Sequence, residues 1–352
     1  MSRPLAPQTP SLPWRITSST IMGLTGLISR GFLLGLNSVE VIGLDKFLAL
    51  LDSRRDPEKR ERGLLTVSNH VSVLDDPLIW GVLPPRYAFT PSNLRFGLGA
   101  HDICFKNPLL TSFFTYGQVL PAHRTKHSPQ HGGLFQPSLN EAIRLLSAPP
   151  PSTATLTYPP AALAPSSLAA RNRHAWIHVF PEGLVHQHPA ADLRYFKWGV
   201  ARLILEAEPA PDVLPMFIDG TQRLMPEHRT FPRFLPRVGQ DVRVAFGDVV
   251  DFEKTFGDLR RRWQGLVARN PEKGGVVGEL RGEELRVGEE AREIRREVAR
   301  RVREEVLKVR RSMGGFGEPE EGLGDARAWA AEGTGKGKRY RSGVDGSDIN
   351  QD

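Results

Sequence analysis

A histidine and an aspartate, His70 and Asp75, are separated by four residues. These are the residue types of a general base and of the carboxylate that orients it. Residues 64–68 favour a short buried strand and residues 76–83 suit a short helix. Residues five apart on one helix lie roughly 140° apart, so the two side chains meet only if the chain turns between them, with Ser72 as the helix N-cap. Such a base could deprotonate an alcohol that attacks a carbonyl carbon.

The same residues also fit readings without this chemistry. In a purely structural role, His70 would end a strand, and Asp75 and Asp76 would cap a helix. Short patterns of this kind also occur by chance. A metal-dependent hydrolase could use the same three side chains, although one histidine and two adjacent acids make a small ligand set. The choice between these readings depends on the rest of the sequence.

Three further residues could contact a substrate. Glu182 and Gly183 follow an expected strand at residues 175–180, where the carboxylate could hold a substrate hydroxyl and the glycine would let a ligand approach closely. Arg124 ends another expected strand, residues 117–124, and its planar guanidinium group could bind phosphate. An ordinary turn with an exposed glutamate, and a surface arginine, are the structural alternatives.

Strand and helix patterns alternate along the chain, which favours an α/β fold with a mixed, mostly parallel central sheet flanked by helices. We expect one such domain over residues 44–311, interrupted at about 148–173 by a disordered insertion rich in Pro, Ala, Ser and Thr. Residues 1–13 and 312–352 should be disordered. Besides the strands above, the expected strands are residues 95–100, 213–217 and 242–246, and the expected helices are residues 107–116, 137–147, 197–208, 252–267 and 283–311.

Residues 14–43 are the most apolar tract of the chain, but Arg30 and several Ser, Thr and Gly residues interrupt it. No uninterrupted run approaches the ~18 apolar residues of a spanning helix. We therefore expect a membrane-associating, interfacial helix with Trp14 and Arg15 at the headgroup level. A buried amphipathic helix that packs on the core is the alternative. The start of the chain lacks acidic residues and contains Arg and Ser, which hints at mitochondrial targeting.

The balance of charges points to an anionic partner. The 352 residues carry a formal net charge of +7, and 39% of them are hydrophobic, enough for a substantial core. The sequence shows no nucleic-acid-binding signature, so an anionic membrane surface is the expected partner. The single cysteine, Cys104, excludes an internal disulfide and is expected to be a small core residue rather than a nucleophile.

Four blocks are specific in combination because of their order. They are SNHVSVLDDP at residues 68–77, residues 117–124, FPEG at residues 180–183 and VLPM at residues 213–216. Over roughly residues 14–265, without the insertion, this arrangement resembles the glycerophospholipid acyltransferase family. The second block departs from the Gly-x-x-Phe-x-x-Arg form of the family, since Leu120 and Pro121 occupy this region and the spacing is longer.

The resemblance implies a CoA-independent O-acyltransferase that moves fatty acyl chains between phospholipids and lysophospholipids without a cofactor. It implies cardiolipin, monolysocardiolipin and phosphatidylcholine as substrates, and a place in one leaflet of mitochondrial membranes, facing the intermembrane space. His70 would be the base oriented by Asp75, and Arg124, Glu182 and Gly183 would position the phosphoglycerol headgroup. No Gly-x-Ser-x-Gly sequence is present, so we expect no acyl-serine intermediate. An acyl-CoA-dependent lysophospholipid acyltransferase and a non-catalytic basic membrane-docking protein are the alternatives.

Overall fold

The protein is described by a computed structural model. It describes residues 11–125, 127–148, 174–227, 229, 231–271, 277–320 and 322–326. The predicted insertion at about 148–173 lies outside these residues except for its first position, as do most of the predicted N-terminal segment 1–13 and the end of the predicted tail 312–352.

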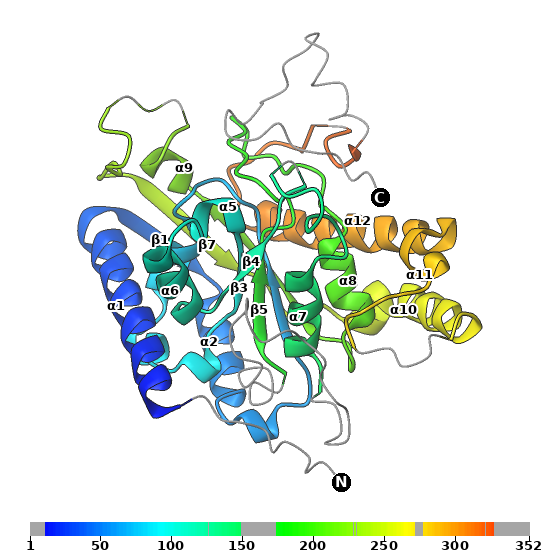
Figure 1. Cartoon of the computed structure of the whole chain (residues 1–352). Coiled ribbons are helices and arrows are strands. Elements are labelled where there is room, and N and C mark those ends of the chain that lie inside the picture. The colour runs from blue at the N-terminus through cyan, green and yellow to red at the C-terminus, as the bar shows by residue number, and fades with distance from the viewer. Residues whose placement is uncertain are drawn as a thin grey trace.

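A mixed five-stranded sheet lies at the centre of the molecule (Figure 1). Its strand order is β1-β7-β6-β2-β5, and every neighbouring pair is parallel except β6 and β7. The strands are β1 (Ser38–Ile42), β2 (Leu64–Val67), β5 (Trp176–Val179), β6 (Asp212–Asp219) and β7 (Asp241–Phe246). A parallel pair, β3 (Gly97–Ala100) and β4 (Val119–Ala122), lies beside β5 through a bridge between Phe96 and Ile177. The predicted mixed, mostly parallel α/β fold is confirmed.

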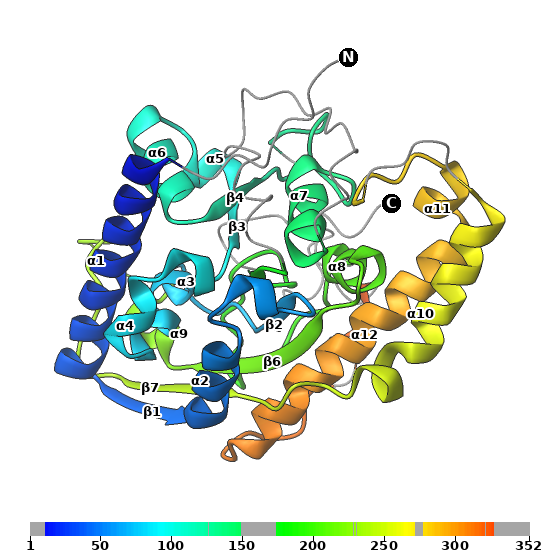
Figure 2. The same cartoon turned by 90° about the horizontal axis from the view of Figure 1, so that it is seen from below.

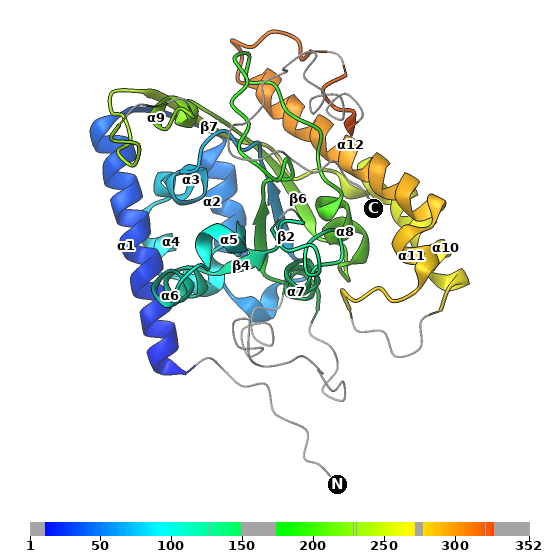
Figure 3. The ribbon, with the colours of Figure 1, turned by 45° about the horizontal axis from the view of Figure 1, so that its top comes forward.

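The central strands are apolar runs because both faces of the sheet are covered. All residues of β2 and β5 are buried. Leu65 and Val67 of β2 join a core with helices α7, α8, α10 and α12, whereas Leu64 points into a second core with α1 and α2. Alternate residues of one strand thus serve opposite faces, as the two-residue period of a strand requires. Figures 2 and 3 show α1 at one side of the sheet and α10 and α12 at the other.

Helices occupy most of the chain between the strands. The α-helices are α1 (Leu12–Leu36), α2 (Leu44–Ser53), α3 (Asp75–Ile79), α4 (Pro85–Ala88), α5 (His101–Cys104), α6 (Pro108–Tyr116), α7 (Pro137–Leu146), α8 (Gly199–Glu206), α9 (Thr221–Leu224), α10 (Phe252–Arg269), α11 (Glu283–Val287) and α12 (Glu289–Ser312). Short 3₁₀ turns add η1 (Pro57–Lys59), η2 (Trp80–Val82) and η3 (Pro91–Asn93).

The structure differs from the sequence predictions in several elements, including the short helices α4, α5 and α9, which were not predicted. Residues 38–42 form the edge strand β1, although we assigned them to the membrane-associating tract that ends at residue 43. Helix α2 was not predicted. The helix predicted over residues 283–311 is two helices, because Gly288 adopts an extended backbone conformation between α11 and α12. The sheet therefore begins before residue 44, where we placed the start of the domain.

Helix α1 turns two of its polar side chains, Ser18 and Arg30, toward the protein. The Ser18 hydroxyl donates to the carbonyl oxygen of Tyr116 at 2.7 Å. Arg30 Nη1 donates to the carbonyl oxygens of residues 81–83 at 3.2 to 3.3 Å. Arg30 therefore does not interrupt the outward face, and the helix is long and apolar enough to cross a membrane by length and composition. The exposed apolar residues of α1 are Leu12, Ile16, Leu24, Leu27, Ile28, Leu34 and Leu36.

Candidate active site

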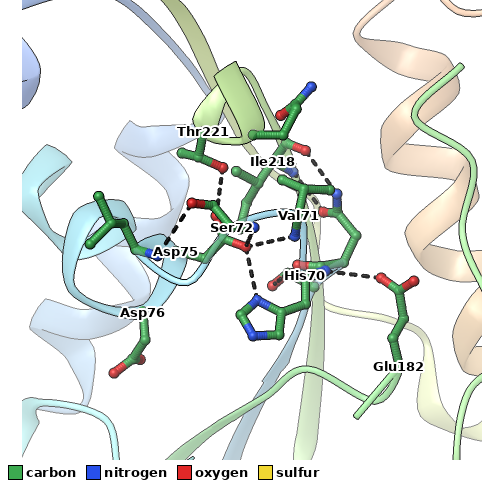
Figure 4. Close-up of polar contacts among 12 residues, drawn as sticks. His70, Val71, Ser72, Asp75, Asp76, Glu182, Ile218 and Thr221 are labelled. Carbon is green, nitrogen blue, oxygen red and sulfur yellow. Dashed lines mark hydrogen bonds and ion pairs between the residues drawn. The ribbon is translucent and has the colours of Figure 1, made fainter. Parts of the chain in front are cut away.

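The predicted contact between histidine and aspartate is present. His70 Nδ1 lies 2.9 Å from Asp75 Oδ2 (Figure 4). The chain leaves β2 at Val67, turns, and enters α3 at Asp75 itself, and this turn brings the two side chains together. The Asp75 side chain is fully buried, whereas 21% of the His70 side chain is exposed. Within the described part of the chain, His70 Nε2 has no hydrogen-bond partner, so this nitrogen is available to a substrate.

Asp75 is held by more than the histidine. Its Oδ2 atom also accepts hydrogen bonds from the backbone N–H groups of Val71 at 2.7 Å and Ser72 at 2.8 Å. Its Oδ1 atom accepts one from the Thr221 hydroxyl at 2.5 Å. Because a carboxylate only accepts, Nδ1 of His70 carries the proton of that contact and Nε2 is left as an acceptor. The arrangement thus fixes both the orientation and the tautomer of the imidazole.

Ser72 contributes to the turn, but not as predicted. The residue at the N-cap of α3 is Leu74, so the prediction of Ser72 as the N-cap was wrong. Ser72 instead closes the turn before the helix: its hydroxyl accepts from the N–H of Leu74 at 3.3 Å and its carbonyl from the N–H of Asp75 at 3.1 Å. The side chain of Asp75 satisfies the N–H of Ser72 in return, so the loop and the carboxylate stabilise each other.

A third segment completes the site from the end of β6. Thr221 begins α9, directly after Gly220, whose backbone has a φ of 99°. The side chain of Asn69 aligns β2 with β6, since it donates to the carbonyl of Ile218 and accepts from the N–H of Ile218, both at 2.8 Å. Sequence reasoning missed Thr221. Thr221 could have been found from its position after the carboxyl end of β6, a strand parallel to β2, because the carboxyl ends of parallel strands meet at one edge of the sheet.

Glu182 supports the backbone of His70. Its Oε1 accepts from the N–H of His70 at 2.9 Å and its Oε2 from the N–H of Arg194 at 3.0 Å. Only 1% of Glu182 is exposed, and burial raises the pKa of its carboxyl group to about 7 despite these two hydrogen bonds. We expected this carboxylate to meet a substrate hydroxyl. Both of its oxygens accept backbone hydrogen bonds, which position the chain around His70.

Gly183 and Arg124 have neighbours within the protein. Gly183 has a φ of 70°, and a Cβ there would lie 2.9 Å from Cδ and Cε of Lys197, so the space beside this glycine is already filled by a side chain. Arg124 Nε donates to Asp102 Oδ1 at 3.0 Å, and a second guanidinium nitrogen contacts Oδ2. This pairing lowers the pKa of Asp102. A phosphate at Arg124 would therefore share the guanidinium group with a carboxylate.

Aromatic and apolar groups surround the base. The Phe180 ring stacks on the His70 ring with 4.2 Å between the ring centres. Behind it, His178 is buried, and this burial lowers its pKa to about 3, so it is a neutral, structural histidine bonded to the Thr66 hydroxyl at 2.8 Å. Val73, in the turn between His70 and Asp75, is 52% exposed. One face of the imidazole is thus covered by an aromatic ring, and an exposed apolar residue follows it in the turn.

Asp76 points away from His70 (Figure 4). Its Oδ1 accepts from Arg95 Nε at 2.8 Å and from Trp80 Nε1 at 3.2 Å. Burial is the largest single influence on the pKa of Asp76 and acts to raise it, but Arg95, His178 and the hydrogen bond from Trp80 together make the net shift downward. Among the described residues, no three His, Cys, Asp or Glu side chains are placed to hold a metal ion. The described residues thus contain no ligand cluster for the metal-dependent hydrolase considered from the sequence.

Known proteins match this chain closely. Residues 39–219, slightly more than half of the chain, match the family model described as Acyltransferase. Tafazzin of Saccharomyces cerevisiae is 36% identical over 317 residues, which cover 85% of this chain and 79% of the yeast protein. Taffazin of Dictyostelium discoideum is 32% identical, covering 66% of this chain and 68% of that protein. N-acylphosphatidylethanolamine synthase of Arabidopsis thaliana is 32% identical, covering 54% and 56%.

The chain belongs to the acyltransferase family, and it is an enzyme that transfers acyl groups. The family and the tafazzin relatives imply phospholipids as its substrates. Within the family, its place is among the tafazzins. The apolar helix α1 and these relatives suggest association with a membrane.

Proposed function

We propose that the protein is a CoA-independent transacylase, which moves a fatty acyl chain from a phospholipid to a lysophospholipid. The observation that carries this proposal is the pair of His70 and Asp75, in which a buried carboxylate holds Nδ1 and leaves Nε2 open. A base of this kind suits a neutral alcohol as the attacking group. Membership among the tafazzins supports two lipids, rather than a lipid and a thioester, as the reacting pair.

The reaction follows from the position of Nε2. The free glycerol hydroxyl of the lysophospholipid donates to Nε2 of His70, loses its proton to it, and its oxygen attacks the ester carbonyl carbon of the donor phospholipid. Asp75 stabilises the imidazolium ion that forms. As the tetrahedral intermediate collapses, the donor's ester C–O bond breaks and His70 returns the proton to the leaving glycerol oxygen. The products are a new phospholipid and a new lysophospholipid, and the base is restored.

The lipids and the location are part of the same proposal. Cardiolipin, monolysocardiolipin and phosphatidylcholine are the proposed substrates, and the net charge of +7 suits the anionic ones. Arg124 would bind a headgroup phosphate while it shares its guanidinium group with Asp102, and Glu182 with Gly183 would shape the adjoining loop. Helix α1 would lie in one leaflet of a mitochondrial membrane, facing the intermembrane space, and the acid-free start of the chain supports this location.

An acyl-exchange assay tests the proposal. Purified full-length protein is given a phospholipid with a labelled acyl chain and an unlabelled lysophospholipid, with and without acyl-CoA and chelator. We expect label transfer without acyl-CoA that chelator does not change, and a His70→Ala protein should lose it. The exposed histidine His131 supplies a matched His131→Ala control, which should retain the wild-type rate. Transfer only from acyl-CoA would support the acyl-CoA-dependent alternative, and wild-type transfer by His70→Ala would refute the mechanism.

A further inference from the structure

Residues 231–239 form an exposed loop, here called the basic–aromatic loop, that lies between α9 and β7. Its large apolar side chains are turned to solvent: Phe231 is 89% exposed, Phe234 77%, Leu235 59% and Val238 54%. Single exposed apolar residues are common on soluble proteins, but four within eight residues of one loop point to an interaction site.

The same loop carries two arginines between these apolar residues. Arg233 and Arg237 are both exposed. In the part of the chain that the structure describes, neither guanidinium group forms an ion pair with a carboxylate. Arg233 Nε donates to the carbonyl of Arg229 at 3.4 Å. Interleaved aromatic and cationic side chains fit the boundary between lipid headgroups and acyl chains, because the rings enter the apolar layer while the cations stay at the phosphates.

The basic–aromatic loop continues the exposed apolar face of α1. The N–H of Gly239 donates to the carbonyl of Leu36, the last residue of α1, at 2.8 Å, and the N–H of Gln240 donates to Asn37 Oδ1 at 3.1 Å. Figures 1 and 3 show the segment after α9 beside this end of α1. Leu34 and Leu36 are exposed at the same end of the helix. One surface therefore joins an apolar helix face to a cationic, aromatic loop.

Helix α9 lies between the loop and Asp75. Thr221, which holds Asp75, starts α9, and the N–H of Arg237 donates to the carbonyl of Leu224, the last residue of α9, at 2.9 Å. The side chain of Gln187 bonds the carbonyl of Met225 at 3.0 Å. Helix α9 thus connects the loop to the carboxylate of the active site through a few hydrogen-bonded residues.

We propose that the basic–aromatic loop docks the enzyme on an anionic phospholipid surface, with Phe231 and Phe234 among the acyl chains and Arg233 and Arg237 at the phosphates. We infer a membrane as the partner because the loop adjoins α1. The apolar face of α1 is not covered by any other segment among the described residues. This inference rests on the proposed function, since docking here would bring ester groups of that membrane to His70.

Vesicle binding by the full-length protein tests the proposal. Vesicles of phosphatidylcholine alone are compared with vesicles that also contain cardiolipin, by co-sedimentation, for Arg233→Gln, Arg233→Glu and Phe234→Ser. We expect the affinity for the anionic vesicles to fall about fivefold for each unit of charge lost at residue 233, and this loss to shrink at high salt. Phe234→Ser should weaken binding to both kinds of vesicle.

Two matched controls lie on the far side of the molecule, on α12 and α10. Arg296 is exposed on α12 and Val267 is 38% exposed on α10, so Arg296→Glu and Val267→Ser repeat the changes of charge and polarity away from α1. Both should bind like the wild type. If Arg233→Glu bound anionic vesicles as the controls do, the docking proposal would be overturned.

Enzyme assays separate this proposal from the proposed function. Arg233→Glu should lower acyl exchange on anionic vesicles more than exchange between short-chain lipids dissolved as monomers, because only the first requires a surface. Equal losses on both would overturn the docking role. The His70→Ala protein should bind vesicles as the wild type does. If it kept its transferase activity as well, the proposed function would fail while the docking result stood.

Discussion

Replacing Thr221 by valine tests whether the hydroxyl on the far side of Asp75 positions the base. Valine keeps the branched shape of threonine and removes only the donor to Asp75 Oδ1, which lies 2.5 Å away. Thr221 is 1% exposed and Asp75 is fully buried, so water does not readily replace the lost hydrogen bond. The carboxylate would then be free to rotate about its remaining contacts, and the imidazole would follow it.

The expected size of the effect comes from the charge and burial of this contact. A hydrogen bond to a charged group contributes about 1.5 to 3 kcal/mol, and an unsatisfied buried acceptor costs a similar amount. If all of this energy appears as a higher activation free energy, because His70 is less well oriented, the rate falls by roughly 10- to 150-fold. Each 1.36 kcal/mol corresponds to a factor of ten in rate. Thr221 is not expected to touch the lipid, so kcat should fall while KM stays close to the wild-type value.

The assay is acyl exchange between a labelled phospholipid and a lysophospholipid, at several concentrations of each, with the unfolding temperature measured in parallel. Thr221→Ser restores the hydroxyl and should restore most of kcat. A Thr221→Val protein with wild-type kcat and a lowered unfolding temperature would refute the reasoning, because it would show that the hydroxyl only stabilises the fold. A rise in KM with unchanged kcat would refute it too, since that result would place Thr221 at the substrate.

Three further predictions concern stability. Burial raises the pKa of Glu182 from 4.5 to about 7. The contribution of this carboxyl group to stability should therefore be full below pH 4.5 and be lost, by about 3 kcal/mol, as pH rises through 7. Glu182→Gln should flatten this pH dependence of the unfolding free energy in denaturant titrations. Gly183→Ala should cost about 1 to 2 kcal/mol in denaturant unfolding, and removing the Lys197 side chain as well should recover only the steric part. Arg95→Met should destabilise the fold by about 3 kcal/mol above pH 4, and by less in acid, because the pKa of Asp76 is lowered by this arginine.

Local patterns were enough to predict most of the sheet and one contact of the site. The strands at Leu64–Val67 and Trp176–Val179 are mostly apolar because both faces are covered, with only Thr66 and His178 polar, and this pattern is visible in the sequence. The contact between His70 and Asp75 was predictable because both residues lie in a single turn. A strand that ends next to the start of a helix allows only a few backbone conformations in between, so the spacing of His70 and Asp75 in the sequence was informative.

The parts that could not be predicted depend on distant partners. Strand β1 is short and only partly buried, and it becomes a strand because Ser38–Ile42 pairs with β7, about two hundred residues later in the chain. Glu182 was predicted to contact a substrate, with an exposed turn residue as the alternative, but its carboxylate is buried and bonded to the backbone N–H groups of His70 and Arg194. The role of Thr221 requires the register between β2 and β6, which no local pattern reveals.

The hydrogen bond between Thr221 and Asp75 joins residues that are 146 positions apart. During synthesis, the ribosome releases His70 and Asp75 long before Thr221 exists, so the nascent chain contains the whole His-x4-Asp sequence without its outer support. A fragment that stops before β6 would likewise keep His70, Asp75, Glu182 and Gly183 and lack both Thr221 and the strand that aligns Asn69. A premature stop codon in that interval would therefore leave a protein that contains every residue of the recognised sequence blocks up to FPEG but cannot assemble a working base.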